Sequence, residues 1–193
     1  MIKIIKDMKF RRRREAKTDY KSRLAIVSGG IDRVVIRKTS RTLVSQVSRY
    51  SEKGDITLAQ ANSGELAAFK WPARSNRPTA YLLGLLLAKK IKADGKLKDG
   101  EFVLDIGLSA PVKNSIPFVF AKGCVDGGIN LRNGIKIEEN VYNCSDSKYA
   151  KELKEKDPEK YQKQYSEYIK AGLDATALGT VFKQAKELIL NAR

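Results

Sequence analysis

RVVIRKTSRTLVSQVSRYSEKGDITLAQA, residues 33–61, contains three short runs in which β-branched or alternating apolar residues predominate. The runs span 33–38, 43–49 and 55–61, and Gly54 lies in the connection between the second and the third. β-Branched and alternating apolar residues are typical of strands. Because the connections are short, we expect the three strands to form an antiparallel meander.

The residues after this meander predict two helices around one more strand. A helix is expected over 78–91, with Asn76 as a candidate N-cap, and it is apolar around most of its circumference. Residues 101–108 read as a buried strand and 116–128 as a second helix. A strand that follows a long helical crossover normally runs parallel to its partner. The predicted fold class is therefore α/β, a mixed sheet of three antiparallel strands, a helix, a parallel strand and a helix.

The two ends of the chain differ from this core. The first 23 residues form a basic arm with little apolar periodicity. Near the other end, the pattern predicts one helix over 157–172 and another, with an apolar stripe, after Asp174. Two short helices bury too little surface to fold alone, so we interpret them as an extension of the core. We therefore divide the chain into a basic arm (1–23), an α/β core domain (24–148) and a helical C-terminal extension (149–193).

The chain is strongly basic, with 38 Lys and Arg against 22 Asp and Glu and a formal net charge of +16. Residues 1–50 contain 15 basic and 4 acidic side chains, whereas residues 101–150 contain 5 and 6. Charge of this size attracts polyanions. Its concentration near one end favours a docking site over a generally basic surface.

The composition argues against most catalytic and metal-binding classes. Histidine, the commonest general base near neutral pH and the commonest metal ligand, is absent. Cys124 and Cys144 stand far apart, so we expect no structural zinc, and without a secretory signal both should be reduced thiols. The longest apolar run, 80–88, is too short to span a bilayer, and we expect a soluble intracellular protein that does not enter membranes.

Five stretches of the chain resemble one family. They are FRRRREAKTDYKSRL (10–24), RPTAYLLGLLLAKK (77–90), VLDIGL (103–108), FAKGCVDGG (120–128) and DPEKYQKQYSEYIK (157–170). In these stretches the chain resembles the 5S-rRNA-binding proteins of the large ribosomal subunit, numbered eighteen in archaea and five in eukaryotes. The last stretch looks more like the eukaryotic branch than like the shorter archaeal form. INLRNGIKIEE, residues 129–139, departs from the family, which usually has a Pro-His-Ser segment there.

The resemblance implies both a fold type and partners. It implies a mixed sheet of the ribonuclease-H-like type, a cytoplasmic location in the large ribosomal subunit, and 5S rRNA, large-subunit rRNA and neighbouring large-subunit proteins as partners. We expect a structural constituent that binds 5S rRNA and helps attach it to the large-subunit rRNA. We expect no catalytic residues, no cofactor, no metal and no homo-oligomer.

The arginine run at 11–14 is the leading candidate for RNA contact. Four adjacent arginines repel one another and order only against an anion, and guanidinium groups bridge phosphates and stack on bases. A second basic group lies on or between the first two strands, and a third flanks Trp71, which we expect in the core. We expect the arm to supply affinity and the folded domain to select the RNA. The predicted RNA-binding residues are Lys9, Arg11, Arg12, Arg13, Arg14, Lys17, Tyr20, Lys21, Arg23, Arg37, Lys38, Arg41, Gln46, Lys70, Arg74 and Arg77.

Two other functions stay open at this stage. A metal-dependent nuclease on the same fold needs clustered carboxylates, but the first strand offers cations, and Asp105, Asp126 and Glu65 are scattered acids. A nucleic-acid chaperone held by charge alone would show no preference for 5S rRNA over tRNA at elevated salt. Separately, three tyrosines at 161, 165 and 168 share one helical face, which we interpret as a docking face for protein or rRNA.

Overall fold

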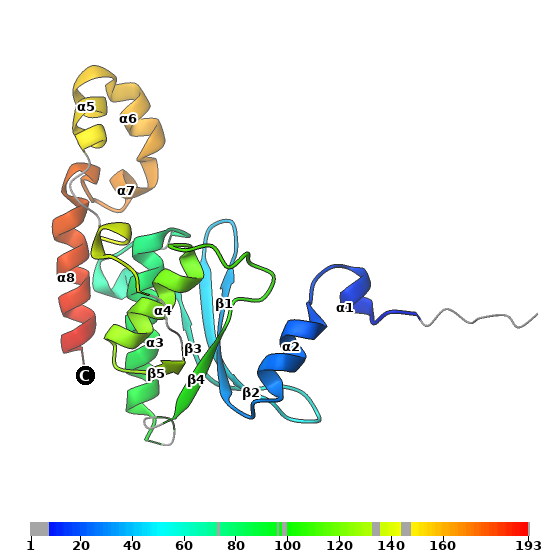
Figure 1. Ribbon diagram of the computed structural model, residues 1–193. Coiled ribbons are helices and arrows are strands. Elements are labelled where there is room, and N and C mark those ends of the chain that lie inside the picture. Colours follow the sequence, from blue (N-terminus) through cyan, green and yellow to red (C-terminus); the bar gives the residue numbers. More distant parts are fainter. Residues whose placement is uncertain are drawn as a thin grey trace, which may run out of the picture.

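The computed structural model describes residues 8–192, except for 73, 96, 98–99, 133–135 and 144–147. Its centre is a five-stranded sheet with the order β3-β2-β1-β4-β5 (Figure 1). The strands are β1 Asp32–Lys38, β2 Leu43–Arg49, β3 Ile56–Asn62, β4 Glu101–Asp105 and β5 Asn130–Arg132.

Of the two cysteines, Cys144 lies outside the described residues. Cys124 is a free, buried cysteine, and burial raises the pKa of its thiol.

The pairing of the strands confirms the predicted mixed sheet. β1 and β2 are antiparallel, as are β2 and β3, while β4 runs parallel to β1. β5, parallel to β4, was missed by the sequence analysis because three residues are too few to show a period. β4 ends at Asp105 rather than at the predicted residue 108, because Gly107 takes the left-handed conformation (φ +62°) that ends the extended backbone.

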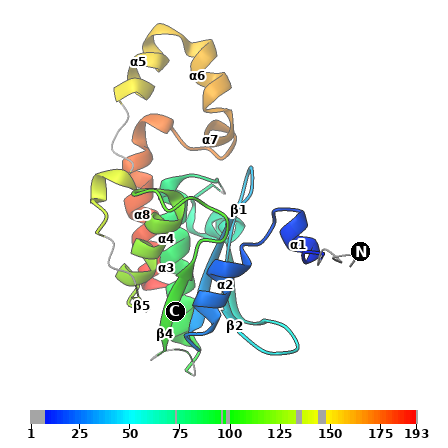
Figure 2. The same cartoon turned by 45° about the vertical axis from the view of Figure 1, so that its right-hand side comes forward.

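Helices α3 (Arg77–Ala93), α4 (Ile116–Asp126) and α8 (Leu178–Asn191) lie together on one side of the sheet in both views (Figures 1 and 2). As predicted, the Asn76 side chain caps α3, accepting a hydrogen bond from the backbone N–H of Thr79 at 3.0 Å. No helix in the described part of the chain is both long and apolar enough to cross a membrane.

Two glycines allow α3 and α4 to pack closely. A Cβ atom on Gly84 would collide with the backbone at Phe120, and one on Gly123 would collide with the backbone at Tyr81. The two helices therefore meet backbone to backbone, so α3 is buried on nearly all sides, as its continuous apolar pattern predicts.

The core lies between the sheet and these helices. It includes the predicted core residue Trp71, which is 1% exposed, packs edge-on against Phe182 and donates a hydrogen bond from Nε1 to the Thr79 hydroxyl at 2.9 Å. Before Trp71, the 3-10 helix η1 (Ser63–Phe69) follows directly on β3. The prediction that Trp71 is a packing residue is confirmed.

The C-terminal extension divides into two parts. α8 buries Phe182, Ala185 and Ile189 in the main core. The preceding elements form a small cluster of their own around Ala150, Tyr161 and Ala175. These elements are α5 (Lys148–Lys156), α6 (Pro158–Gln164), α7 (Ser166–Lys170) and the 3-10 helix η3 (Ala175–Ala177), while a further 3-10 helix, η2 (Glu139–Val141), lies between β5 and α5.

The predicted single helix over 157–172 is wrong, because it is interrupted at Tyr165 between α6 and α7. The tyrosine face is not an open docking surface either. Tyr161 and Tyr168 are buried, and the Tyr161 hydroxyl donates to Asp174 Oδ1 at 2.9 Å. Other parts of the same chain therefore cover this tyrosine face. The prediction failed because tyrosines at helical spacing indicate a buried face but not whether the chain itself or a partner buries it.

Candidate nucleic-acid interface

The sheet face opposite α3 and α4 carries polar side chains. Side chains alternate between the two faces of a strand, and Val34 and Ile36 of β1 belong to the core, so Arg33 and Arg37 face the other way. On the same face Gln46 of β2 donates from Nε2 to Gln60 Oε1 of β3 at 3.1 Å. Helix α2 (Tyr20–Val27), described below, lies beside this polar sheet face (Figure 1).

The first helix, α1 (Arg11–Arg14), consists of the four predicted arginines and buries none of them. Arg11 pairs with Glu15 at 2.9 Å, and Arg12 donates from Nε to the Thr18 hydroxyl at 2.7 Å. Arg14 also donates from Nη1 to Met8 Sδ at 3.3 Å, so the contacts of the run are local and its side chains stay exposed. In both views α1 projects away from the core (Figures 1 and 2).

The second helix, α2 (Tyr20–Val27), was not predicted. Asp19 starts it, because its carboxylate accepts hydrogen bonds from the backbone N–H groups of Lys21 and Ser22 at 3.0 and 3.3 Å. The helix spans both sides of the boundary expected after residue 23. Its apolar residues form no stripe, which hid it from a search for periodicity, although Asp19 was a readable cap signal.

An ionic network connects α2 to the sheet. Asp55, in the β2–β3 connection, accepts from Arg23 of α2 at 2.8 Å and from Arg33 of β1 at 2.6 Å. Arg33, whose side chain is 3% exposed, also contacts Asp105 at the end of β4 at 3.2 Å. Two carboxylates and two guanidinium groups thereby link strands β1 and β4, the β2–β3 connection and helix α2.

The charges of this network set the protonation of Asp55. Burial alone would raise the pKa of the Asp55 carboxyl, but hydrogen bonds and attraction from Arg33, together with those from Arg23, lower it below its usual range. Asp55 is therefore ionised at neutral pH and holds both arginines. The roles of Arg33 and Asp55 were not predicted, because their partners are 22 to 72 residues away along the chain.

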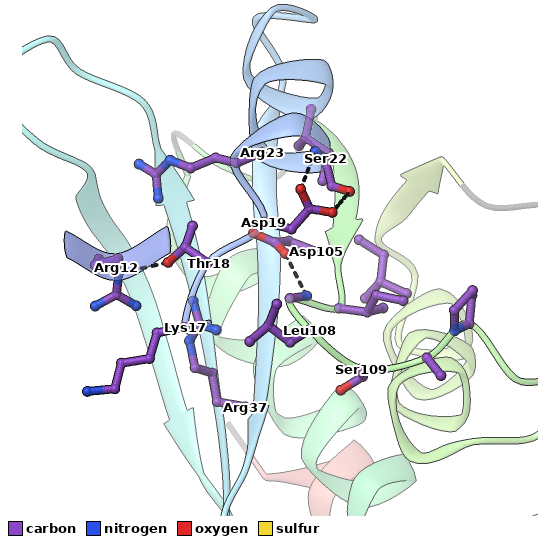
Figure 3. A pocket seen from close by; sticks show the side chains of 16 residues that line it. Arg12, Lys17, Thr18, Asp19, Ser22, Arg23, Arg37, Asp105, Leu108 and Ser109 are labelled. Atoms are coloured by element: carbon purple, nitrogen blue, oxygen red, sulfur yellow. Dashed lines mark hydrogen bonds between the residues drawn. The ribbon is translucent and has the colours of Figure 1, made fainter. Parts of the chain in front are cut away.

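Between α1, α2 and the β4–α4 loop lies a cleft of about 460 Å³, which we call the arm cleft. Figure 3 shows Arg12, Lys17 and Arg37 on one side of it and the loop residues Leu108 and Ser109 on the other. Gly107 lets the loop approach Arg37 closely, since a Cβ there would lie 3.1 Å from Arg37 Nη1. The arm and the first strand, predicted separately, thus supply cations to one concave surface.

The structure brings together part of the predicted site. Of the predicted residues, Arg12, Lys17, Arg23 and Arg37 line the arm cleft. Tyr20 packs its ring against Phe10, with centroids 5.3 Å apart, which keeps the ends of α1 and α2 together. The predicted residues Lys9, Arg11, Arg13, Arg14 and Lys21 are exposed on the same arm.

The other predicted residues lie elsewhere. Arg41 and Arg74 share a second cleft of about 350 Å³, at the N-terminus of α3, with Glu167 of α7. There Arg74 pairs with Glu167 at 3.0 Å and lies over the Tyr168 ring at 4.8 Å, so its charge is already matched within the chain. The predicted residues Lys38, Lys70 and Arg77 are exposed.

The acidic residues of the chain make no metal site in the described residues, where no three His, Cys, Asp or Glu side chains are grouped to hold an ion. Asp19 and Asp105 do both line the arm cleft, a pairing that sequence spacing did not suggest. Asp126, by contrast, accepts from the Tyr81 hydroxyl at 2.9 Å on the other side of the sheet. The fold and this site define a basic α/β protein whose cations gather on an N-terminal arm and on one sheet face.

Comparison with known proteins identifies the family. Residues 6–102 match the family described as ribosomal large subunit proteins 60S L5 and 50S L18. The chain is 41% identical over 187 residues to "Large ribosomal subunit protein uL18" of Methanococcus maripaludis, covering 94% of each chain. It is 39% identical over 186 residues to the protein of the same name from Thermofilum pendens, covering 94% of this chain and 93% of the relative. The chain belongs to this family of large-subunit ribosomal proteins.

Family membership confirms the expected class, a structural protein of the cytoplasmic large ribosomal subunit that associates with rRNA and ribosomal proteins. One expectation is corrected. The two relatives are archaeal and align over 94% and 93% of their length, so the description of the archaeal form as shorter is wrong for these two.

Proposed function

We propose that the chain binds 5S rRNA and helps attach it to the large-subunit rRNA. The observation that carries the proposal is the arm cleft, where cations from the arm and from β1 meet on one surface. RNA is recognised largely through phosphates, 2′-hydroxyl groups and unstacked bases. A concave basic surface beside four exposed arginines matches those groups.

The two parts of the interface have different roles in this proposal. α1 neutralises phosphates, which gives affinity and salt dependence but little choice of sequence. The cleft and the polar sheet face select the RNA by shape. We retain the division into arm (1–23), core (24–148) and extension (149–193), with the first boundary falling inside α2. We also retain the assignment of the core to the ribonuclease-H-like type, which the strand order β3-β2-β1-β4-β5 supports.

Binding to 5S rRNA and to tRNA over a salt series tests the proposal. If the arm and sheet neutralise roughly eight phosphates, log K should fall with log salt at a slope of about −6 to −7. Charge attracts both RNAs, and salt weakens that shared attraction. If the folded domain recognises the shape of 5S rRNA, the preference for 5S rRNA over tRNA should therefore persist at elevated salt. Equal affinity for the two RNAs at elevated salt would instead indicate a chaperone held by charge alone.

We also propose that the chain is not an enzyme. A two-metal nuclease needs clustered carboxylates, whereas no three acidic side chains of the described residues are grouped to hold an ion, and Asp105 is paired with the positive charge of Arg33. Incubation of the protein with 5S rRNA and magnesium should leave the RNA intact. Cleavage that disappears in Asp105→Ala would overturn this part of the proposal.

A further inference from the structure

The shape of the arm cleft limits what can enter it. A volume of about 460 Å³ lies in the range of small-molecule sites, which are roughly 300–1,000 Å³. An A-form duplex is far too wide to enter, but one nucleotide turned out of a bulge or loop is of the right size. Proteins that bind RNA sequence-specifically recognise mainly such unstacked nucleotides.

The chemistry of the cleft differs from wall to wall. Arg12 and Lys17 at the rim can hold a phosphate, while Arg37 and Leu108 offer a guanidinium plane and an apolar side chain, the surfaces on which bases stack (Figure 3). Asp19 and Asp105 would repel a phosphate placed between them. A nucleotide therefore fits with its phosphate at the rim and its base inside.

Asp105 can select the base. Each carboxylate oxygen has two lone-pair directions. In the described residues, Oδ1 accepts one hydrogen bond, from Gly107 N–H at 2.9 Å, and Oδ2 accepts one, from Arg33 at 3.2 Å. One acceptor position remains on each oxygen, and the side chain is 14% exposed where it lines the cleft. Asp19 is less suited, because its Oδ1 already caps α2 twice.

Two acceptors side by side match one base better than the others. Guanine presents two adjacent donors, N1–H and N2–H, on its Watson–Crick edge. Adenine and cytosine place an acceptor beside their amino group, and uracil flanks its single N–H with two acceptors. A carboxylate repels each of those acceptors.

We propose that the arm cleft receives one unpaired guanosine nucleotide of the bound RNA, with Asp105 on its Watson–Crick edge. This inference rests on the proposed RNA-binding function and adds a base-specific position to it. Arg33 holds the Asp105 side chain in place, so the ionic network that fixes α2 also prepares the base site.

The test uses short RNA hairpins that carry one bulged nucleotide, titrated with the full-length protein and followed by fluorescence anisotropy. A bulged guanosine should bind about tenfold more tightly than a bulged adenosine, cytidine or uridine, the order expected of one bidentate base contact. Inosine, which lacks the N2 amino group, should lose most of that preference. These comparisons need no protein variant.

Protein variants assign the preference to the site. Asp105→Asn should abolish the preference for guanosine over the other three bulged nucleotides. Glu101→Gln, at the other end of the same strand, where Glu101 pairs with Arg132, is the matched control and should keep the preference. Should Asp105→Asn fail to fold, the guanosine-to-inosine comparison on the native protein still decides.

Equal affinity of the native protein for all four bulged hairpins would overturn this inference. Preserved 5S rRNA binding in that case would leave the proposed function standing, so the two failures are distinguishable.

Discussion

The two ends of the molecule use their helices in opposite ways. α8 buries Phe182, Ala185 and Ile189 in the main core, whereas α2 buries no residue and leaves Leu24 69% exposed. The reason is in their patterns, because α8 has an apolar stripe and α2 has none. Packing holds α8, but a salt bridge and a cap hold α2. The C-terminal helix stabilises the fold, and the N-terminal helices remain available for a ligand.

The largest expected effect breaks the C-terminal side of this comparison. Phe182→Ala should destabilise the protein by about 3–5 kcal/mol, because it removes a buried ring that packs on Trp71 and Tyr81. Urea unfolding measures the loss, and the exposed Lys183→Ala is the control. A change below about 1 kcal/mol would mean that α8 does not belong to the core.

Replacing Arg11, Arg12, Arg13 and Arg14 together with alanine tests the N-terminal side. Stability should hardly change, because none of the four is buried. RNA affinity should fall about 10- to 100-fold at moderate salt, and the salt slope should flatten by about 3 to 4. Filter binding over a salt series measures both. An unchanged slope would contradict the role proposed for the arm.

Asp55→Asn should loosen α2 from the sheet. The amide keeps the size of the side chain but not the charge that faces Arg23 and Arg33, and the expected loss of unfolding free energy is about 1–3 kcal/mol. Amide hydrogen exchange in α2 should accelerate more than exchange in α8. Equal protection of α2 in both proteins would show that the network does not position the arm.

Asp55 also predicts a pH dependence. Its pKa is lower folded than unfolded, so the stability it contributes is complete above the unfolded value of about 3.9. That contribution should disappear as the pH falls through the folded pKa. In urea unfolding between pH 7 and pH 3, the difference in stability between the native protein and Asp55→Asn should therefore become smaller towards the acidic end. A constant difference across the range would contradict this assignment.

The smallest expected effect concerns the ion pair between the C-terminal extension and Arg74, a predicted RNA-binding residue. Glu167→Gln removes the charge partner of Arg74 in an exposed ion pair, which should cost less than about 1 kcal/mol of stability. It should raise RNA affinity slightly if Arg74 contacts phosphate. Glu159→Gln, on the neighbouring helix α6, is the matched control. An unchanged affinity would remove Arg74 from the interface.

Prediction succeeded where local pattern was sufficient. The β-branched run 34–36 between two arginines placed β1 to within one residue. The Asn76 cap and the continuous apolar run placed α3 to within two residues at each end. It failed at β5, which is too short to show a period, and at α2, which has a cap but no stripe. It also failed at Tyr165, where the chain leaves the helical conformation between α6 and α7 although the tyrosines at 161, 165 and 168 keep a regular helical spacing.

For the site, the sequence alone determined which residue types would bind a polyanion, because a run of adjacent arginines with no acidic residue among them can be recognised without the structure. Tertiary structure decided which of them act together. Arg12 and Arg37 share a cleft, whereas Arg74 is matched by Glu167. Only the fold brings Arg33 to Asp55 and Asp105, since side-chain contacts between distant residues depend on how strands and helices pack. The basic character of the site could therefore be predicted from the sequence, but the cleft in which the cations are arranged could not.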